Sequence, residues 1–469
     1  MRYLLNEEYA LRSFIGVPHC CYKRGTVKAQ KLTREEFDFL LRCDGLHELS
    51  CAEIPTERVR NMIHPAAPNE TLLPRQQYRV CDNRYFPEIN WMLTGRCNYN
   101  CLHCFNASDL SPSASEWSWE DAEILMDEAA MCGVNAFTLT GGEPMLHPRF
   151  LDIVRGIYAR GMFVHELNTN GAFLTSEILG EFQKLGARPL IKISFDGLGW
   201  HDWLRNRPGA EERTLAAIRL CTEAGFPVKV QYNVHRKNVC TATETALFLE
   251  RMGVTETRII RTSESPRWAE LGKGQTLSFP EYYEHMLSFS EEWLQTPHTM
   301  AITIWHMEKL PRIPEPGEPR EAARAEADWV SLSRYHPESY VCPDCRFLAA
   351  FTAEGDLVPC LQMSGRFSKD GTHLGNVKGG GLQKLLREGS YLDTVCLTLR
   401  DLINANESCA NCPHFLDCQG GCRAIAIICT GDYLGPDSAR CIYYREGYAA
   451  RMHTLFRRAV SGNLQAFSH

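Results

Sequence analysis

The sequence of 469 residues lacks the features that mark several common protein classes. It has no run of about 18 apolar residues, so we expect no membrane-spanning helix. Glu7 and Glu8 stand where a signal peptide would carry its apolar core, which argues against export. The net charge of −7 argues against nucleic-acid binding through an overall positive field. We therefore expect a cytoplasmic protein with neither a membrane nor a nucleic-acid partner.

Cysteine, by contrast, is abundant, with 21 residues in the chain. In a reducing compartment, many cysteines indicate metal ligation or redox chemistry rather than disulfides. Those with informative spacing are Cys97-x3-Cys101-x2-Cys104, Cys342-x2-Cys345, Cys360, Cys409-x2-Cys412-x5-Cys418-x3-Cys422 and Cys441. The others are scattered, and a buried apolar role is the simplest interpretation for most of them.

The first 88 residues have a pattern of their own. Thr33 and Glu36 form a capping box, which predicts the start of a helix. Residues 1–5 and 26–29 are expected to pair as a short β-ribbon. Small helices beside a β-ribbon suit a winged-helix-like module, which we assign to residues 1–88.

Apolar strand-like runs alternate with helical stretches between residues 89 and 300. The expected strands are 89–93, 136–140, 162–167, 191–195, 228–234 and 257–261. The expected helices are 119–131, 148–160, 175–185, 211–224, 241–252 and 281–294. This alternation predicts an α/β fold with a parallel sheet. Six units fall short of the eight of a closed barrel, so we expect a partial (β/α)6 TIM-like barrel.

Residues 301–340 are expected to form a bridging segment, followed by a cysteine-rich domain at 341–469. This last part is rich in cysteine and glycine and poor in long periodic elements. Since it shows no large apolar core of its own, we expect bound metal to hold it together.

Cys97, Cys101 and Cys104 directly follow the first expected strand. In α/β barrels the active site gathers at the carboxyl ends of the strands. Three thiolates on a [4Fe–4S] cube leave one iron open to a ligand that is not protein. A structural zinc site normally takes four protein ligands. A zinc site completed by His103 is the alternative, and it would make the protein a zinc-binding interaction protein without catalysis.

The loop after the second expected strand reads Thr140-Gly141-Gly142-Glu143-Pro144. The two glycines let the backbone approach a ligand closely. Glu143 can accept hydrogen bonds from a cationic amino group. Alone, this segment would be an ordinary strand-to-helix turn, but its place one βα unit after the three cysteines favours a binding role.

These motifs together resemble those of the radical S-adenosylmethionine (SAM) superfamily. The matching segments are Cys97-Asn-Tyr-Asn-Cys101-Leu-His-Cys104, Gly141-Gly142-Glu143-Pro144, Leu167-Asn-Thr-Asn-Gly171 and Ile193-Ser-Phe-Asp-Gly197. The resemblance implies a partial (β/α)6 barrel, a [4Fe–4S] cluster and SAM as cofactors. It also implies the reaction: one electron from the cluster splits SAM, and the 5′-deoxyadenosyl radical removes a hydrogen atom from the substrate.

The resemblance also implies residue roles. Glu143, with Gly141, Gly142 and Pro144, would hold the amino group of the methionine moiety of SAM. Ser194 would contact the ribose.

Arg205 would bind the methionine carboxylate, with Arg207 as its rival. His103 and Asn168 are further expected cofactor contacts, and Asn233 is a weaker one. We interpret Asp196, which precedes Gly197, as a turn residue.

The C-terminal cysteines resemble the SPASM extension of the same superfamily, which holds two auxiliary [4Fe–4S] clusters. The resemblance implies one cluster on Cys342, Cys345, Cys360 and Cys422, and a second on Cys409, Cys412, Cys418 and Cys441. Eight thiolates for eight irons leave no open iron, so electron transfer or structural support is the expected role. Two zinc sites on the same ligands are the alternative.

SPASM-containing enzymes often modify peptides or proteins. A module like residues 1–88 resembles the element of ribosomal-peptide (RiPP) maturases that binds the leader of a precursor peptide. We therefore expect hydrogen-atom abstraction from a peptide residue, giving a thioether or another crosslink, with a flavodoxin or ferredoxin as electron donor. A peptide epimerase using Cys429 as hydrogen donor and a sulfatase-maturing-type enzyme that oxidises a Cys or Ser are alternatives.

Overall fold

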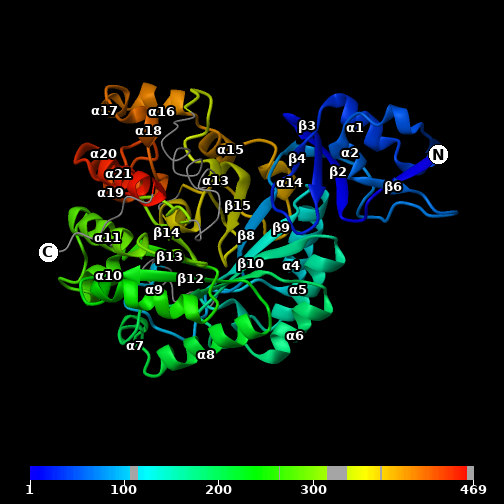
Figure 1. The fold of residues 1–469 in the computed structure, drawn as a ribbon. Coiled ribbons are helices and arrows are strands. Elements are labelled where there is room, and N and C mark those ends of the chain that lie inside the picture. Colours follow the sequence, from blue (N-terminus) through cyan, green and yellow to red (C-terminus); the bar gives the residue numbers. More distant parts are fainter. Residues whose placement is uncertain (106–114, 264, 314–334, 370–371, 462–469) are drawn as a thin grey trace.

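A computed structural model describes residues 1–105, 115–263, 265–313, 335–369 and 372–461 (Figure 1). Its centre is a nine-stranded sheet in the order β14-β13-β12-β11-β10-β9-β8-β15-β16. The parallel strands of the barrel are β8 (Glu88–Met92), β9 (Ala136–Thr140), β10 (Phe163–Thr169), β11 (Leu190–Ser194), β12 (Val228–Val234), β13 (Glu256–Arg261) and β14 (Ala301–Ile304). The expected strands and the partial barrel are confirmed, and β14 adds a further strand from the start of the segment 301–340. The rest of that segment lies largely outside the described residues.

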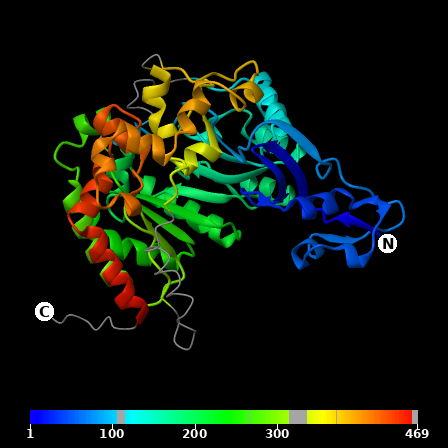
Figure 2. The same cartoon turned by 90° about the horizontal axis from the view of Figure 1, so that it is seen from above.

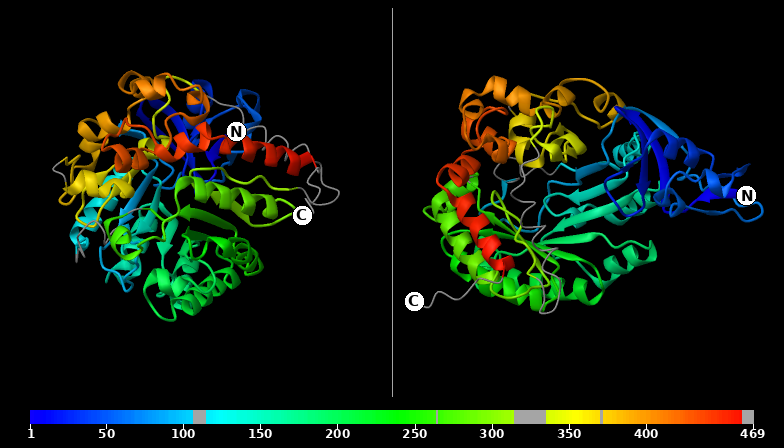
Figure 3. Two further views of the ribbon diagram at one scale, coloured as in Figure 1. Left: turned by 90° about the vertical axis from the view of Figure 1, so that its left-hand side faces the viewer. Right: turned by 45° about the horizontal axis from the view of Figure 1, so that its top comes forward.

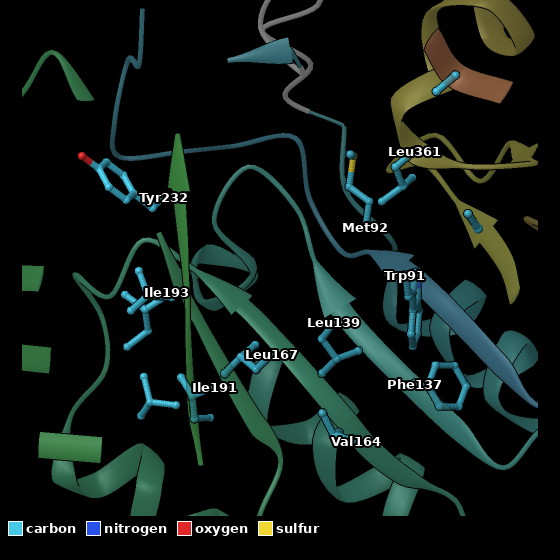
Figure 4. Close-up of a cluster of buried hydrophobic side chains, with 14 of the residues drawn as sticks. Trp91, Met92, Phe137, Leu139, Val164, Leu167, Ile191, Ile193, Tyr232 and Leu361 are labelled. Carbon is cyan, nitrogen blue, oxygen red and sulfur yellow. The ribbon is translucent and has the colours of Figure 1, made fainter. Parts of the chain in front are cut away.

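Helices cover the outer face of this sheet (Figure 2). They are α4 (Trp119–Met131), α5 (Phe150–Ala159), α6 (Ser176–Lys184), α8 (Ala210–Glu223), α9 (Ala242–Arg251) and α11 (Phe279–Trp293), close to the expected bounds. Alternate strand residues such as Phe137, Leu139, Leu167 and Ile191 pack into the core beneath the helices (Figure 4). Because strand side chains alternate between faces, the residues between them point to the inner face of the barrel.

The N-terminal part contains two small sheets. One has the order β5-β1-β6, formed by β5 (Asp44–Glu48), β1 (Arg2–Leu5) and β6 (Ile63–Pro65). The other has the order β4-β3-β2-β7, formed by β4 (Gln30–Lys31), β3 (Val17–Lys23), β2 (Tyr9–Ile15) and β7 (Arg79–Arg84). The expected pairing of residues 1–5 with 26–29 is therefore wrong. β3 instead pairs with β2 through a tight turn at Gly16, which has a φ of 79°.

The predicted capping box is present at the start of α1 (Arg34–Leu41). The Glu36 backbone N–H donates to the Thr33 hydroxyl, and the Thr33 N–H donates to the Glu36 carboxylate at 2.9 Å. α1 and α2 (Glu57–Arg60) share a core with the sheet β5-β1-β6, to which Phe37, Leu40 and Val59 contribute. The N-terminal part thus has an apolar core separate from that of the barrel.

The C-terminal part is built mostly from short helices. They are α13 (Pro343–Phe347), α14 (Leu382–Leu385), α15 (Ser390–Val395), α16 (Leu399–Ala405), α17 (Glu407–Ala410), α18 (Phe415–Cys418), α19 (Arg423–Thr430), α20 (Ser438–Arg445) and the longer α21 (Tyr448–Ser461). Strand β15 (Leu348–Phe351) pairs in parallel with β8, and β16 (Leu357–Val358) pairs with β15.

The C-terminal part adds most of its large apolar side chains to the barrel core, and its separate cluster is small. Its side chains Phe351, Tyr391, Tyr443 and Met452 are buried in the same cluster as the barrel core. The Tyr283 hydroxyl of α11 also donates to the Ala439 carbonyl at 2.7 Å. The C-terminal part therefore packs on the barrel. Its helices α20 and α21 lie away from the N-terminal part, whereas α14 contacts β7 (Figure 3). Within the described residues, no helix is long and apolar enough to cross a membrane.

We predict that Gly133→Ala destabilises the protein more than Gly186→Ala. Both glycines follow a helix with positive φ, 70° and 63°, so each substitution should cost about 1 kcal/mol in backbone strain. A Cβ at Gly133 would lie 2.7 Å from the Cys81 sulfur and 2.8 Å from Phe14, where the N-terminal part meets the barrel. At Gly186 no atom lies within 4 Å. Overpacking should add roughly 1–3 kcal/mol at Gly133. Thermal unfolding midpoints test this, and equal midpoints would contradict it.

Candidate functional site

The three-cysteine loop follows β8 at the carboxyl end of the sheet. Cys97 lies exposed at its rim, Cys101 is buried and Cys104 is half-buried. Burial raises the pKa of Cys101, and the neighbouring Cys104 raises it further, although Arg205 acts in the opposite direction. The backbone N–H of Tyr99 donates to the Cys97 sulfur at 3.4 Å. Burial and the two neighbouring thiols also raise the pKa of Cys97, so Cys97 and Cys101 need added positive charge to ionise, as bound iron would supply.

The glycine loop lies directly against the chain that leads to Cys97. The Gly142 N–H donates to the Thr94 carbonyl at 2.7 Å, and the Glu143 N–H donates to the Arg96 carbonyl at 2.8 Å. A Cβ on Gly142 would overlap the Arg96 carbonyl, and one on Gly141 would lie 2.7 Å from the Thr94 oxygen. Both positions therefore require glycine because the two loops touch there, whether or not a ligand binds.

The Glu143 carboxylate is fully buried and is used by protein donors. It accepts from the Thr169 hydroxyl at 2.9 and 3.0 Å and from the Asn170 N–H at 2.8 Å. Burial raises its pKa to about 7. Pro144 begins the short helix that follows. The Glu143 side chain thus joins the glycine loop to the end of β10. Its role in holding the methionine amino group of SAM stays a prediction.

Asp196 is the centre of a buried polar network. Its carboxylate accepts from the Arg205 Nε at 2.6 Å and from both the backbone N–H and the side-chain amide of Asn233 at 3.1 and 3.2 Å. Burial alone would raise the pKa of Asp196, but the Arg205 charge holds it far below its usual range. Asp196 does precede Gly197, with a φ of 93°, yet the interpretation as a mere turn residue is wrong.

The structure distinguishes Arg205 from Arg207. Arg205 is 7% exposed, and its Nη1 donates to the Cys101 sulfur at 3.8 Å, whereas Arg207 is exposed. The Arg205 Nη2 is buried and has no partner among the described residues. A buried guanidinium donor without a partner is costly, so it suits an anionic group of a ligand.

Other expected cofactor contacts also present free polar atoms. Within the described part of the chain, the Nδ1 of His103 and the Oδ1 of Asn168 are buried without a partner. Burial lowers the pKa of His103 to about 3, so its imidazole is neutral. Ser194 is half-buried at the end of β11. These residues fit a polar ligand beside the three-cysteine loop.

Thr169 and Asn170 were missed by the sequence prediction. Besides its bond to Glu143, Asn170 donates from Nδ2 to the Asn98 oxygen at 2.8 Å, within the three-cysteine loop. Both residues lie in the segment Leu167–Gly171 that carries the resemblance. The sequence of that segment could have indicated them as site residues. It does not predict which side chain contacts which loop.

The inner face of the sheet is polar. Lys192 pairs with Glu166 at 3.0 Å, and Lys229 pairs with Glu256 at 2.8 Å. The strand register places Asn168, Lys192, Lys229 and Glu256 in one row across the sheet. The Nε of Arg258, on the same face as Glu256, is buried without a partner in the described residues. This face offers charges and hydrogen bonds rather than apolar contact.

The C-terminal cysteines fall into two groups of neighbours. Cys345 shares a hydrogen bond with Cys342, which together with burial and the charges of Cys342, Cys360 and Cys422 raises its pKa well above the usual value. Cys409, Cys412, Cys418 and Cys441 line one cavity. The Asp437 carboxylate lies between the groups, since it accepts from the Cys422 N–H at 2.7 Å and from the Arg440 N–H at 3.1 Å. The exposed Cys429 belongs to neither group.

No set of three or more His, Cys, Asp or Glu side chains in the described residues is arranged to hold a metal ion. The assignment of the C-terminal cysteines to two groups therefore depends only on which thiols are neighbours. They are the same two sets of four that the resemblance implied.

The chain is similar to a known family and to several known proteins. Residues 91–249 match the model of the Radical SAM superfamily. The chain is 29% identical over 359 residues to the AdoMet-dependent heme synthase of Methanosarcina barkeri, covering 76% of this chain and 96% of the relative. It is 26% identical over 363 residues to mycofactocin maturase MftC of Mycobacterium tuberculosis, covering 74% and 81%. The structure of Streptococcus suis SuiB bound to precursor peptide SuiA matches with a TM-score of 0.65 at 13% identity, covering 94% of this chain and all of that chain, which shows a shared fold.

The match to the Radical SAM model shows that the chain is an enzyme, and that family implies SAM and a [4Fe–4S] cluster. Residues 91–249 form a radical SAM domain, and the relatives of the chain carry the names of enzymes.

We predict that Arg205→Lys weakens SAM binding by about tenfold or more, because lysine cannot reproduce the planar fork that bonds Asp196 and leaves Nη2 available. Arg207→Lys, at the exposed neighbour, should bind SAM like the wild type. Equilibrium binding of SAM and the yield of 5′-deoxyadenosine measure the effect, with iron content as the control for an intact site. Equal losses in both variants would contradict the assignment.

Proposed function

We propose that the protein uses SAM to abstract a hydrogen atom from a residue of a peptide, installing a thioether or other crosslink. Cys97, Cys101 and Cys104 would hold the [4Fe–4S] cluster, which with SAM supplies the 5′-deoxyadenosyl radical when bound. Arg205 would bind the carboxylate of the methionine moiety. The loop Gly141–Pro144 and the residues His103, Asn168 and Ser194 would position the rest of the cofactor.

The structure of the N-terminal part is the main support for a peptide substrate. It has two sheets and a core of its own, within residues 1–88 that we assign to peptide recognition. The likeness to SuiB extends over 94% of the chain, and that protein was solved with its precursor peptide. Exposed strands at sheet edges allow a peptide to bind by adding a strand. This supports a leader-binding role for the N-terminal part.

We assign residues 89–300 together with β14 to the barrel, and residues 341–469 to a domain with two auxiliary [4Fe–4S] clusters. Cys342, Cys345, Cys360 and Cys422 would hold one, and Cys409, Cys412, Cys418 and Cys441 the other. The first of these sets packs against the barrel core, which supports electron transfer between a flavodoxin or ferredoxin and the SAM-binding cluster.

A heme-synthase-like activity is the second candidate, because the Methanosarcina barkeri relative is matched over 96% of its length. The polar inner face of the barrel favours a peptide substrate over a tetrapyrrole. Its ion pairs Glu166–Lys192 and Lys229–Glu256 suit polar peptide groups better than the broad apolar face of a tetrapyrrole.

Replacing Cys97, Cys101 and Cys104 together by Ala should abolish 5′-deoxyadenosine formation, because the open iron is lost. The variant should keep about eight of about twelve irons per chain, held by the other two groups of cysteines. Anaerobic purification, iron analysis and chromatography of the nucleoside products measure this. A colourless wild-type protein would favour zinc sites, and an unchanged nucleoside yield would refute the cluster assignment.

Reduced enzyme supplied with SAM and co-expressed short peptides from neighbouring genes should change one peptide by a loss of about 2 Da, the two hydrogens removed by a crosslink. Mass spectrometry measures this. An unchanged mass with an inverted residue would indicate an epimerase, and oxidation of a sulfatase Cys or Ser would indicate a sulfatase-maturing enzyme. Heme formed from an added iron porphyrin, with no peptide change, would favour the second candidate.

A further inference from the structure

A pocket lies where the N-terminal part meets the barrel, at the opposite ends of the strands from the three-cysteine loop. Segments around β2, β3 and β7 form one wall, and the turns before β9 and β10 form the other. The charged residues of its lining are five arginines and two glutamates: Arg12, Arg24, Arg75, Arg79, Arg160, Glu7 and Glu8. The lining is therefore strongly basic.

Both glutamates already have a cationic partner. Glu7 pairs with Arg75 at 3.5 Å, and Glu8 pairs with Lys23 at 3.3 Å. The Arg160 side chain pairs at 2.6 Å with Asp127, which lies outside the lining.

The remaining three arginines have no carboxylate partner in the described part of the chain. Arg12 donates to main-chain carbonyl groups at 2.7–3.0 Å, and Arg79 donates to the carbonyl of Ala130. Arg24 lines the pocket and is exposed. Three positive charges thus converge without a compensating anion.

These charges repel one another. Burial and the Arg79 charge lower the pKa of Arg12, and burial and the Arg24 charge lower the pKa of Arg75. An anion between such groups would relieve the repulsion. The guanidinium fork matches the two oxygens of a carboxylate in particular.

We propose that this pocket binds the carboxylates of an acidic peptide segment. The segment that supplies Arg75 and Arg79 also exposes Leu73 and Tyr78, at 40% and 43%, close in sequence to residues of the lining. A small inorganic anion would leave these apolar side chains uncovered, whereas a peptide with acidic and apolar residues would cover them. The inference rests on the proposed function and adds to it an acidic anchor segment, held far from the reacting residue.

The test uses the full-length protein with its clusters reconstituted and two fluorescent probes. One is a short peptide of alternating Glu and Leu, and the other carries Gln in place of Glu. Fluorescence anisotropy should show the Glu peptide binding at least about tenfold more tightly than the Gln peptide. Arg24→Glu should reduce binding of the Glu peptide by about tenfold or more. Arg219→Glu, an exposed control on α8, should leave it unchanged.

The yield of 5′-deoxyadenosine without peptide should be the same in both variants, since neither residue lies near the three-cysteine loop. Equal binding of the two probes, or an Arg24→Glu variant that binds the Glu peptide normally, would overturn the inference. Inorganic phosphate that displaces the probe, combined with equal affinity for a Glu peptide lacking Leu, would indicate a small-anion site and also overturn it. Because binding is measured without turnover, these outcomes are independent of whether a peptide is modified.

Discussion

The buried ion pair between Asp196 and Arg205 is the constraint on which the site depends. It joins the end of β11 to α7 (His201–Arg205), and through Asn233 it also fixes the end of β12. Arg205 then reaches the sulfur of Cys101. Breaking such a pair by removing one partner typically costs about 3–5 kcal/mol, because a charge stays buried and unpaired. The three-cysteine loop is thus held against a rigid set of strand ends.

Glu143 acts in the same way on the other side of the loop. Its carboxylate links the glycine loop to the end of β10 through Thr169 and Asn170, and Asn170 continues to Asn98. Loop residues after β8, β9 and β10 are therefore joined by hydrogen bonds rather than merely adjacent. Fixing the ends of several strands in this way preorganises a binding site, so that little ordering is needed when a ligand enters.

The apolar core unites the catalytic barrel and the cysteine-rich part. Tyr391, Tyr443 and Met452 share the cluster that contains the residues beneath the barrel helices. The C-terminal cysteines are consequently positioned by packing as well as by the ligands they would bind. The N-terminal part differs, since it has a separate core and meets the barrel through a charged pocket.

Local sequence patterns determined the strands, the helices and the order of the chemistry along the chain. Apolar runs alternating with helical stretches located the barrel units, and the spacing of Cys97, Cys101 and Cys104 predicted a [4Fe–4S] site. The tertiary structure alone decided the partners of Asp196 and Glu143, the separation of Arg205 from Arg207, the pairing of β1 with β5 and β6, and the packing of the C-terminal part. Each of these depends on residues far apart in sequence, and local periodicity says which face a side chain takes but not which distant group it meets there.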